Sequence, residues 1–518
     1  MHESASFFKI QNSKKIVYCI HKQNYMKSQD IKSQDPKDEQ LIENKELSIF
    51  EALIPILLLI AILAYNVYAY GDSATAGPNQ FALIIGGAIA AIVGFLNKVT
   101  YKAMMEEIAK NVKSTAGAIL ILLMVGALSG TWLISGVIPT MIYYGLQILH
   151  PAIFLPACLV ICAVISIATG SSWTTSATVG IALIGIGSTI GMPLGMVAGA
   201  VVSGAYFGDK LSPLSDTTNL APAMAGTDLF THIRYMTITT VPTMIITLLL
   251  FIFLGLAQTT NGSGDNSATL TSINDAFTIS PWLFLVPGIV ILLIIKKTEP
   301  LIALLIGTLL GGVFALIFQP ELVAKIGGSS HLSFVSGYKG VMNAITVETS
   351  VETTNQMLSD LFSAKGMKGM MSTIWLILCA MVFGGVMEAI GALTRITDSL
   401  LKLFHTTFGL FASTVASCLA LNLTASDQYL AIVVPGKMFT KAYQDKGLAP
   451  ENLSRTLEDS GTVTSALIPW NTCGAYQAGV LGVSTISYLP YAFFNIISPF
   501  MTLLFAAFNI KIKQLTTK

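Results

Sequence analysis

Apolar segments of about 20 residues recur along most of this chain, and about 20 apolar residues are what an α-helix needs to cross a bilayer. Examples are residues 51–70, 152–169 and 300–318. Only 11% of the 518 residues are charged, whereas a soluble domain carries about 25%. We therefore expect an all-α polytopic membrane protein with about 11–14 hydrophobic segments, whose first partner is the lipid bilayer.

The distribution of lysines predicts how the chain crosses the membrane. Four lysines lie in residues 97–113, whereas the preceding connection, residues 71–79, has no Lys or Arg. Positively charged loops stay in the cytoplasm, so residues 97–113 and both termini are expected there. The sequence thus predicts a multi-pass protein of the cell (plasma) membrane. The net charge of +1 gives no reason to expect a nucleic-acid partner.

Polarity divides the chain into five parts. Residues 1–48 are polar and rich in lysine, lack the apolar core of a signal peptide, and are predicted to form a disordered cytoplasmic tail. Residues 49–257 and 281–508 are predicted to be transmembrane repeats 1 and 2. Between them, residues 258–280 contain no Lys or Arg and are predicted to be an external linker. Residues 509–518 should form a short cytoplasmic tail.

One strongly polar stretch lies inside the apolar part of the chain. Residues 203–228 contain Asp209 and Asp216, several hydroxyl side chains, and glycines and prolines that interrupt a helix. Non-helical backbone at membrane depth is tolerated only where it is buried in protein or lines a watery cavity. Ionisable groups there mark the path of an ion or substrate. This stretch therefore predicts a transport site.

The two halves of the chain repeat one another. Three pairs of blocks recur in order at a spacing of 253–255 residues: 127–136 with 382–391, 168–175 with 423–430, and 211–226 with 464–479. Repeat 1 begins in the cytoplasm and repeat 2 begins after an external linker, so the repeats should be inverted. Inverted structural repeats with discontinuous or re-entrant helices that meet near the midplane are typical of secondary transporters.

The candidate ion- and substrate-binding residues are the polar side chains at two breaks in each repeat. In the first repeat they are Thr169, Ser171, Ser172, Asp209, Ser212, Ser215, Asp216, Thr217, Thr218 and Asn219. In the second repeat they are Ser426, Asp427, Asp459, Thr462, Ser465, Asn471 and Thr472. Asp216 and Asp427 are the predicted ligands of a transported Na⁺. We expect no resident cofactor, and we consider a second copy of the chain, in a homodimer, as a candidate partner.

Some of the acidic residues can also be interpreted as having a structural role in place of ion binding. Asp209 and Lys210 would be an ion pair at the end of a helix, and Asp216 would be a helix cap. Glu458 and Asp459 would begin a helix at the cytoplasmic surface, where acidic residues are favourable in the first turn. Asp427 lies between two apolar runs, which favours a functional role.

Other functional classes lack their motifs. The sequence has no HExxH or GxSxG motif, which argues against a membrane-embedded hydrolase. It also has no GxxxxGK[ST] loop, which argues against an ATP-driven pump. We therefore do not expect an enzyme. An ion channel is a remaining alternative, because inverted repeats alone do not exclude this class of protein.

Three stretches are similar to the NhaC family of Na⁺/H⁺ antiporters. They are GSSWTTSATVG (170–180), GAYFGDKLSPLSDTTNLAPAMAGTDLFTHIRYM (204–236) and LEDSGTVTSALIPWNTCGAYQAGVLGV (457–483). The resemblance extends over about residues 50–508 and implies that Na⁺ leaves the cell in exchange for protons. One branch of the family is similar to Na⁺- and H⁺-coupled exchangers of malate and lactate, so these small carboxylates are alternative substrates. The three stretches do not separate the two branches.

Overall fold

The computed structural model describes residues 41–70, 74, 76–148, 150–257, 267–296, 298–353, 359, 362–403 and 406–515. Most of the predicted N-terminal tail and residues 258–266 of the predicted linker therefore lie outside the described residues. The chain groups into two units, residues 1–41 and 42–518. The fold below is that of the second unit.

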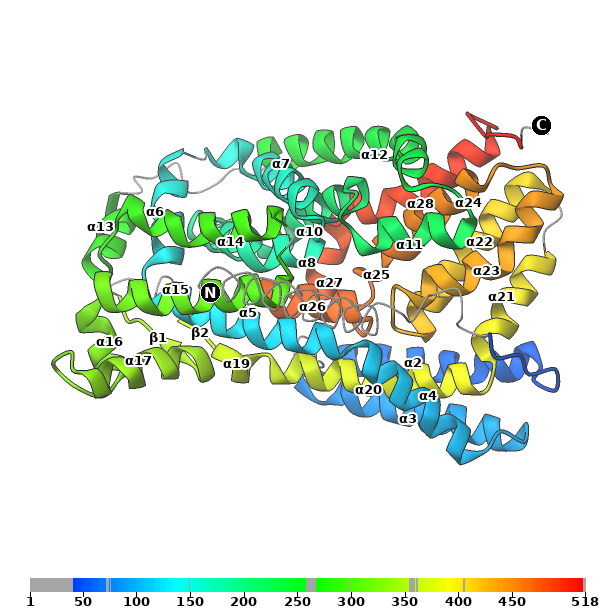
Figure 1. Ribbon diagram of the computed structural model, residues 1–518, viewed down its shortest axis with the longest axis horizontal. Coiled ribbons are helices and arrows are strands. Elements are labelled where there is room, and N and C mark those ends of the chain that lie inside the picture. Colours follow the sequence, from blue (N-terminus) through cyan, green and yellow to red (C-terminus); the bar gives the residue numbers. More distant parts are fainter. Residues whose placement is uncertain are drawn as a thin grey trace, which may run out of the picture. The chain divides into compact units, whose positions relative to one another are not determined.

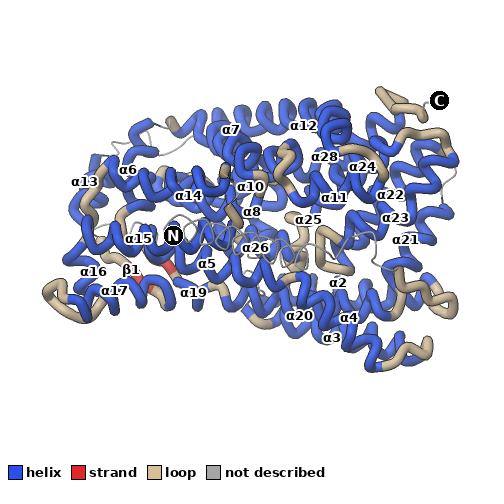
Figure 2. The backbone as a smooth tube through the Cα atoms, viewed as in Figure 1, coloured by secondary structure: helices blue, strands red, loops and turns tan. Residues whose placement is uncertain are grey.

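Helices form almost all of the described structure (Figures 1 and 2). Eight helical spans are long and apolar enough to cross a membrane, and the number rises to 10 if each of two bent pairs is one span. The eight are α2 (Ile49–Tyr70), α3 (Pro78–Leu96), α5 (Ala116–Ile134), α7 (Pro151–Thr169), α12 (Leu229–Ala257), α15 (Pro300–Phe318), α19 with α20 (Gly366–Gly369 and Met371–Ala389) and α22 (Thr407–Thr424). The predicted helical multi-pass class is confirmed.

The two bent pairs and several interrupted helices account for the larger number of segments expected from the sequence. The bent pairs are α13 (Ser267–Ala276) with η4 (Pro281–Phe284) and α14 (Leu285–Ile295), and α27 (Thr485–Tyr488) with η6 (Leu489–Tyr491) and α28 (Phe493–Ala507). The interrupted helices are α8 (Ser172–Thr175), η3 (Ser176–Gly180), α9 (Ile181–Thr189), α10 (Leu194–Leu211), α11 (Asp216–Ala225), α23 (Leu430–Asp445), α24 (Pro450–Leu457), η5 (Glu458–Thr462), α25 (Val463–Ser465) and α26 (Thr472–Leu481).

The remaining elements are shorter. They are α4 (Tyr101–Ser114), α6 (Val137–Ile148), α16 (Pro320–Ile326), α17 (Phe334–Thr346), α21 (Ala392–Leu403) and the strands β1 (Thr349–Ser350) and β2 (Ser363–Ala364). The strands pair antiparallel, with Thr349 opposite Ala364 (Figure 2). This small hairpin is a departure from the all-helical expectation.

Two glycines set the position of α10 against α7. A Cβ on Gly204 would lie 2.3 Å from the carbonyl oxygen of Leu159, and one on Gly208 would lie 2.5 Å from that of Ala163. Glycine therefore lets the two helix backbones approach closely, as small residues do in membrane proteins. The consequence is functional, because the last turn of α10 and its Asp209 come to lie beside the end of α7.

Candidate ion-binding site

Four helix breaks converge on one cavity. Each repeat supplies two of them: residues 170–171 and 212–215 from the first, and residues 425–429 and 466–471 from the second. The cavity has a volume of about 450 Å³, and residues at or beside all four breaks line it. In Figure 1 the corresponding helices, among them α8, α10, α11 and α26, meet in the middle of the view. The polar interruptions of the sequence thus come together in space.

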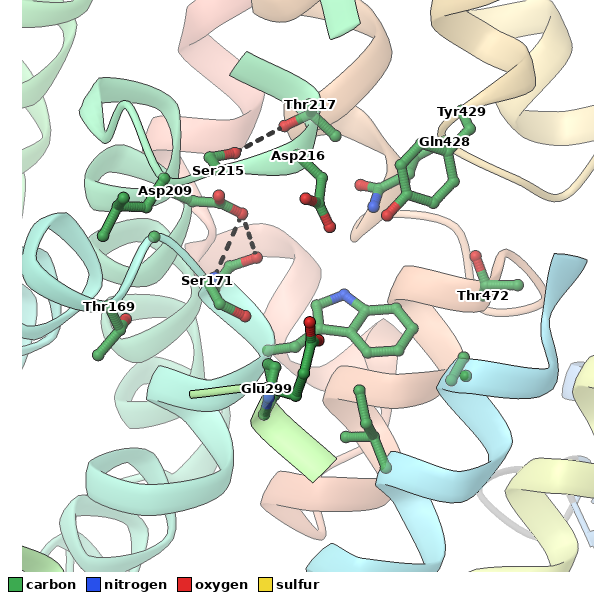
Figure 3. A pocket seen from close by; sticks show the side chains of 18 of the residues that line it. Thr169, Ser171, Asp209, Ser215, Asp216, Thr217, Glu299, Gln428, Tyr429 and Thr472 are labelled. Carbon is green, nitrogen blue, oxygen red and sulfur yellow. Dashed lines mark hydrogen bonds between the residues drawn. The ribbon is translucent and has the colours of Figure 1, made fainter. Parts of the chain in front are cut away.

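The cavity is acidic. Four carboxylates line it, those of Asp209, Asp216, Glu299 and Asp427. None of the described residues that line it is Lys, Arg or His. Hydroxyl side chains of both repeats complete the wall, including those of Thr169 and Thr472 (Figure 3). Such a wall favours a cation and disfavours an isolated anion.

The first break orients Asp209. Gly170 ends α7 with a left-handed φ of 70°, which a glycine adopts without steric cost. Ser171 then caps α8 by accepting a hydrogen bond from the amide of Thr174. The chain turn presents Ser172 to Asp209, and both the amide and the hydroxyl of Ser172 donate to Asp209 Oδ2, at 3.2 and 2.7 Å. Asp209 is therefore held in place from the opposite wall.

The second break presents Asp216 to the cavity. Ser215 is the N-cap of α11 and accepts from the amide of Thr218, so the reading of Asp216 as the cap is wrong. Asp216 is the first residue of α11, where a negative charge is favourable. No described residue donates a hydrogen bond to its carboxylate, which points into the cavity (Figure 3). Among the acids at the four helix breaks, Asp216 is thus the carboxylate most available to a cation.

The third and fourth breaks are joined to each other. Ser426 has a left-handed φ of 59°, and its carbonyl oxygen accepts from the amide of Thr472 at 2.9 Å. Asp427 Oδ1 accepts from the amides of Tyr429 and Leu430 at 2.8 and 3.1 Å, at the start of α23. These bonds fix the side chain of Asp427, which lines the cavity together with Asp209 and Asp216.

The structure separates the candidate residues into two groups. Those lining the cavity are Thr169, Ser171, Ser172, Asp209, Ser215, Asp216, Thr217, Asp427 and Thr472. Those outside its lining are Ser212, Thr218, Asn219, Ser426, Asp459, Thr462, Ser465 and Asn471. Several of the second group bond the backbone beside the breaks. For example, Thr218 donates to the carbonyl oxygens of Asp209 and Lys210, and Asn471 caps α26.

Asp459 has a different partner from the one expected for an acid at the cytoplasmic surface. It is fully buried and forms an ion pair with Lys210, which is also fully buried. The hydroxyls of Ser498, Thr239 and Thr502 donate to the same carboxylate. The surface reading of Asp459 is therefore wrong, and so is the pairing of Lys210 with Asp209.

The cavity wall also includes residues that were not among the candidates, among them Trp173, Glu299, Gln428 and Tyr429. Glu299 lies in the short connection between α14 and α15, next to Pro300. In the sequence it reads as an ordinary interfacial acid beside Lys296 and Lys297. Gln428 and Tyr429 follow Asp427 directly, so a wider window around that acid would have included them.

This arrangement defines a class of protein. Discontinuous helices from two halves of a multi-pass helical protein enclose a cavity lined by acids, two of which, Asp209 and Asp427, are buried. Secondary transporters build their ion and substrate sites in this way. Residues 204–510 match the family model described as "Na+/H+ antiporter family". The chain belongs to this family.

Individual relatives cover nearly the whole transmembrane part. The chain is 39% identical over 431 residues to the Na(+)/H(+) antiporter NhaC of Alkalihalophilus pseudofirmus, covering 83% of this chain and 90% of the relative. It is 37% identical to the Na(+)/H(+) antiporter NhaC of Bacillus subtilis, covering 82% and 91%. It is also 36% identical to a malate-2H(+)/Na(+)-lactate antiporter of the same organism, covering 87% and 92%. The NhaC resemblance is confirmed.

Proposed function

We propose that the protein exports Na⁺ in exchange for protons by alternating access, without a resident cofactor. The observation that carries this proposal is the acidic cavity, where four carboxylates and several hydroxyls meet and the described lining has no cationic side chain. Oxygen atoms at broken helices are the usual ligands of Na⁺ in secondary transporters. The names of the two NhaC relatives, both Na(+)/H(+) antiporters, agree with this chemistry.

Exclusion between Na⁺ and H⁺ on the cavity carboxylates would produce the exchange. A carboxylate that holds a proton has lost the charge that attracts Na⁺, and bound Na⁺ lowers the affinity of the same carboxylate for a proton. Among the acids at the helix breaks, Asp216 is the candidate for this role, because no described residue occupies its oxygens with a hydrogen bond. Asp209 and Asp427 would complete the Na⁺ site from the two repeats.

Exchange of small carboxylates coupled to Na⁺ and H⁺ is the second candidate. Two observations favour it: the named malate/lactate relative, and a cavity volume of about 450 Å³, which falls in the range of small-molecule sites. An organic acid would have to bind together with Na⁺, because the described lining contributes four carboxylates and no Lys, Arg or His.

Exchange by the purified protein in liposomes separates the two candidates. We expect an outward Na⁺ gradient to drive protons into the vesicles, and Li⁺ and K⁺ should be tested beside Na⁺. The proton movement should not require malate or lactate. A flux that appears only when one of these acids is present would select the carboxylate exchanger and reject simple Na⁺/H⁺ exchange.

We also infer that the protein lies in the plasma membrane with residues 267–280 outside and residues 97–113 inside. A cysteine in place of Asn274, an exposed residue, should react with an impermeant maleimide added to intact cells. A cysteine in place of the exposed Lys102 should react only after the cells are opened. The five cysteines among the described residues are buried, so Cys19 alone should be removed first. The opposite labelling pattern would reverse the orientation.

A further inference from the structure

The carboxyl group of Glu458 lies directly behind the wall of the cavity. It is fully buried in the π-helical turn η5, between α24 and α25. It does not line the cavity. Single π-helical turns inside α-helices are often found at functional sites. The earlier reading of Glu458 as an acid at the membrane surface is wrong, and its burial needs another reason.

One oxygen of Glu458 is linked to the cavity by hydrogen bonds. Thr217, which lines the cavity, donates through its hydroxyl to Glu458 Oε1 at 3.0 Å. The Thr217 hydroxyl also lies 3.2 Å from that of Ser215, a second lining residue (Figure 3). A continuous chain of hydroxyls therefore leads from the cavity to Glu458. Protons can pass along such a chain from one hydroxyl to the next.

The second carboxyl oxygen of Glu458 differs from the first in its hydrogen bonding. Glu458 Oε2 has no hydrogen-bond partner among the described residues. Burying an ionised carboxylate with an unpaired oxygen costs several kcal/mol, so the observed geometry suits a carboxyl group that carries a proton on Oε2. Thr462, on the same π-helical turn, has an unpaired hydroxyl as well, so a small rearrangement would provide a partner.

The surrounding charges oppose this preference for the protonated form. Lys210 on α10 forms its ion pair with Asp459, and its positive charge also favours ionised Glu458. Arg455, one turn before Glu458, is fully buried, and its guanidinium lies 4.7 Å from the centre of the Tyr235 ring with no hydrogen-bond partner among the described residues. It adds a second buried positive charge on α24, the helix that precedes η5. Both protonation states are thus accessible, as a proton carrier requires.

Among the other packed elements, Asp209 on α10 carries a negative charge that favours protonated Glu458. Asp209 and Asp216 on α11 both face the cavity. The ionisable side chain of α22 is Cys418, beside Ser460. Beside Gly461 of η5, α23 places the backbone of Ala431 and the side chain of Ile432, and α28 contains no charged residue.

We propose that Glu458 is a separate proton-binding site, connected to the Na⁺ cavity by the hydroxyls of Thr217 and Ser215. In the transfer step, Thr217 gives its proton to Oε1 of ionised Glu458 and takes one from Ser215, which takes one from the cavity. Rotation of the carboxyl group then brings the protonated oxygen to the unpaired position, and Thr217 again donates to the other oxygen. A proton on Glu458 repels Na⁺ from Asp209, Asp216 and Asp427, so the proton returns to the cavity by the reverse steps before Na⁺ enters. This inference rests on the proposed Na⁺/H⁺ exchange and moves the proton from the cavity carboxylates to Glu458, so that the two ions exclude one another through their charges.

Two fluxes measured on the same proteoliposomes test the inference. Glu458→Gln resembles the protonated form and should lower Na⁺-driven proton movement by about 100-fold, while exchange of labelled Na⁺ for unlabelled Na⁺ continues. Thr217→Val removes the hydroxyl at nearly constant volume and should have the same selective effect. Thr217→Ser keeps the hydroxyl and should retain proton movement. Glu321→Gln, at an exposed glutamate, is the matched control.

The outcomes are distinct. Proton movement at the wild-type rate in Glu458→Gln or in Thr217→Val would overturn the separate site. Loss of both fluxes in Thr217→Val would also overturn it, because Thr217 would then serve Na⁺ binding itself. If Glu458→Gln fails to fold, the comparison of Thr217→Val with Thr217→Ser decides whether the separate proton-binding site exists. A wild-type protein that moves no protons in response to Na⁺ would refute the proposed function instead, and the inference would fall with it.

Discussion

Replacing Lys210 by methionine should lower the free energy of unfolding by about 3–5 kcal/mol, because Asp459 would be left as an uncompensated buried charge. Both side chains are fully buried, and they form an ion pair between α10 and η5. Loss of the ammonium leaves the carboxylate with hydroxyl donors alone. The measurement is thermal unfolding of the purified protein in detergent, followed by circular dichroism.

The double variant Lys210→Met with Asp459→Asn identifies the cause. Removing both charges leaves no isolated ion, so the double variant should recover most of the lost stability. Lys339→Met, at an exposed lysine, should unfold at the wild-type temperature. A Lys210→Met variant as stable as wild type would mean that the ion pair does not hold α10 against η5. A double variant that is no more stable than Lys210→Met would indicate lost packing.

The spans and the breaks were predictable because each has a local physical cause. Apolar runs of sufficient length must become membrane helices, and a stretch such as residues 203–228 cannot face lipid. The repeat spacing of 253–255 residues then predicted that the helix breaks of the two halves would face each other. The convergence of all four breaks on one cavity follows this logic.

The direction of each side chain at the breaks was not predictable. Thr217 and Thr218 are neighbours of the same chemical type, yet Thr217 lines the cavity and Thr218 bonds the end of α10. Which one faces inward depends on where α11 begins, and Ser215 sets that point as the cap. Periodic patterns do not specify side-chain direction across a helix break.

The long-range charge pairs were not predictable either. Lys210 and Asp459 are 249 residues apart, and each also has an acidic neighbour in sequence. The sequence made Asp209 the natural partner of Lys210, but successive residues on a helix point in different directions. Asp209 therefore faces the cavity while Lys210 faces η5. Glu299 was missed because it follows Lys296 and Lys297 and therefore reads as part of a charged loop at the membrane surface.

The larger functional effect is expected at the two predicted Na⁺ ligands. Asp216→Asn and Asp427→Asn should each lower Na⁺-dependent proton movement in everted membrane vesicles by about 100-fold, which corresponds to about 3 kcal/mol for a contact to a charged group. The change removes one negative charge and keeps the size of the side chain. For Asp427 it also keeps the oxygen that accepts from the amides of Tyr429 and Leu430, and asparagine is itself a good helix cap.

Because both substitutions preserve local structure, a loss of transport reports on the charge. Asp275→Asn is the matched control, since Asp275 is exposed on α13 and does not line the cavity. All three variants should reach the membrane in wild-type amounts and unfold at similar temperatures. Exchange at the wild-type rate in both Asp216→Asn and Asp427→Asn would move the Na⁺ site elsewhere. Loss of transport in only one of these two variants would mean that only the acid replaced in that variant binds Na⁺. The other carboxylate would then serve to shape the cavity.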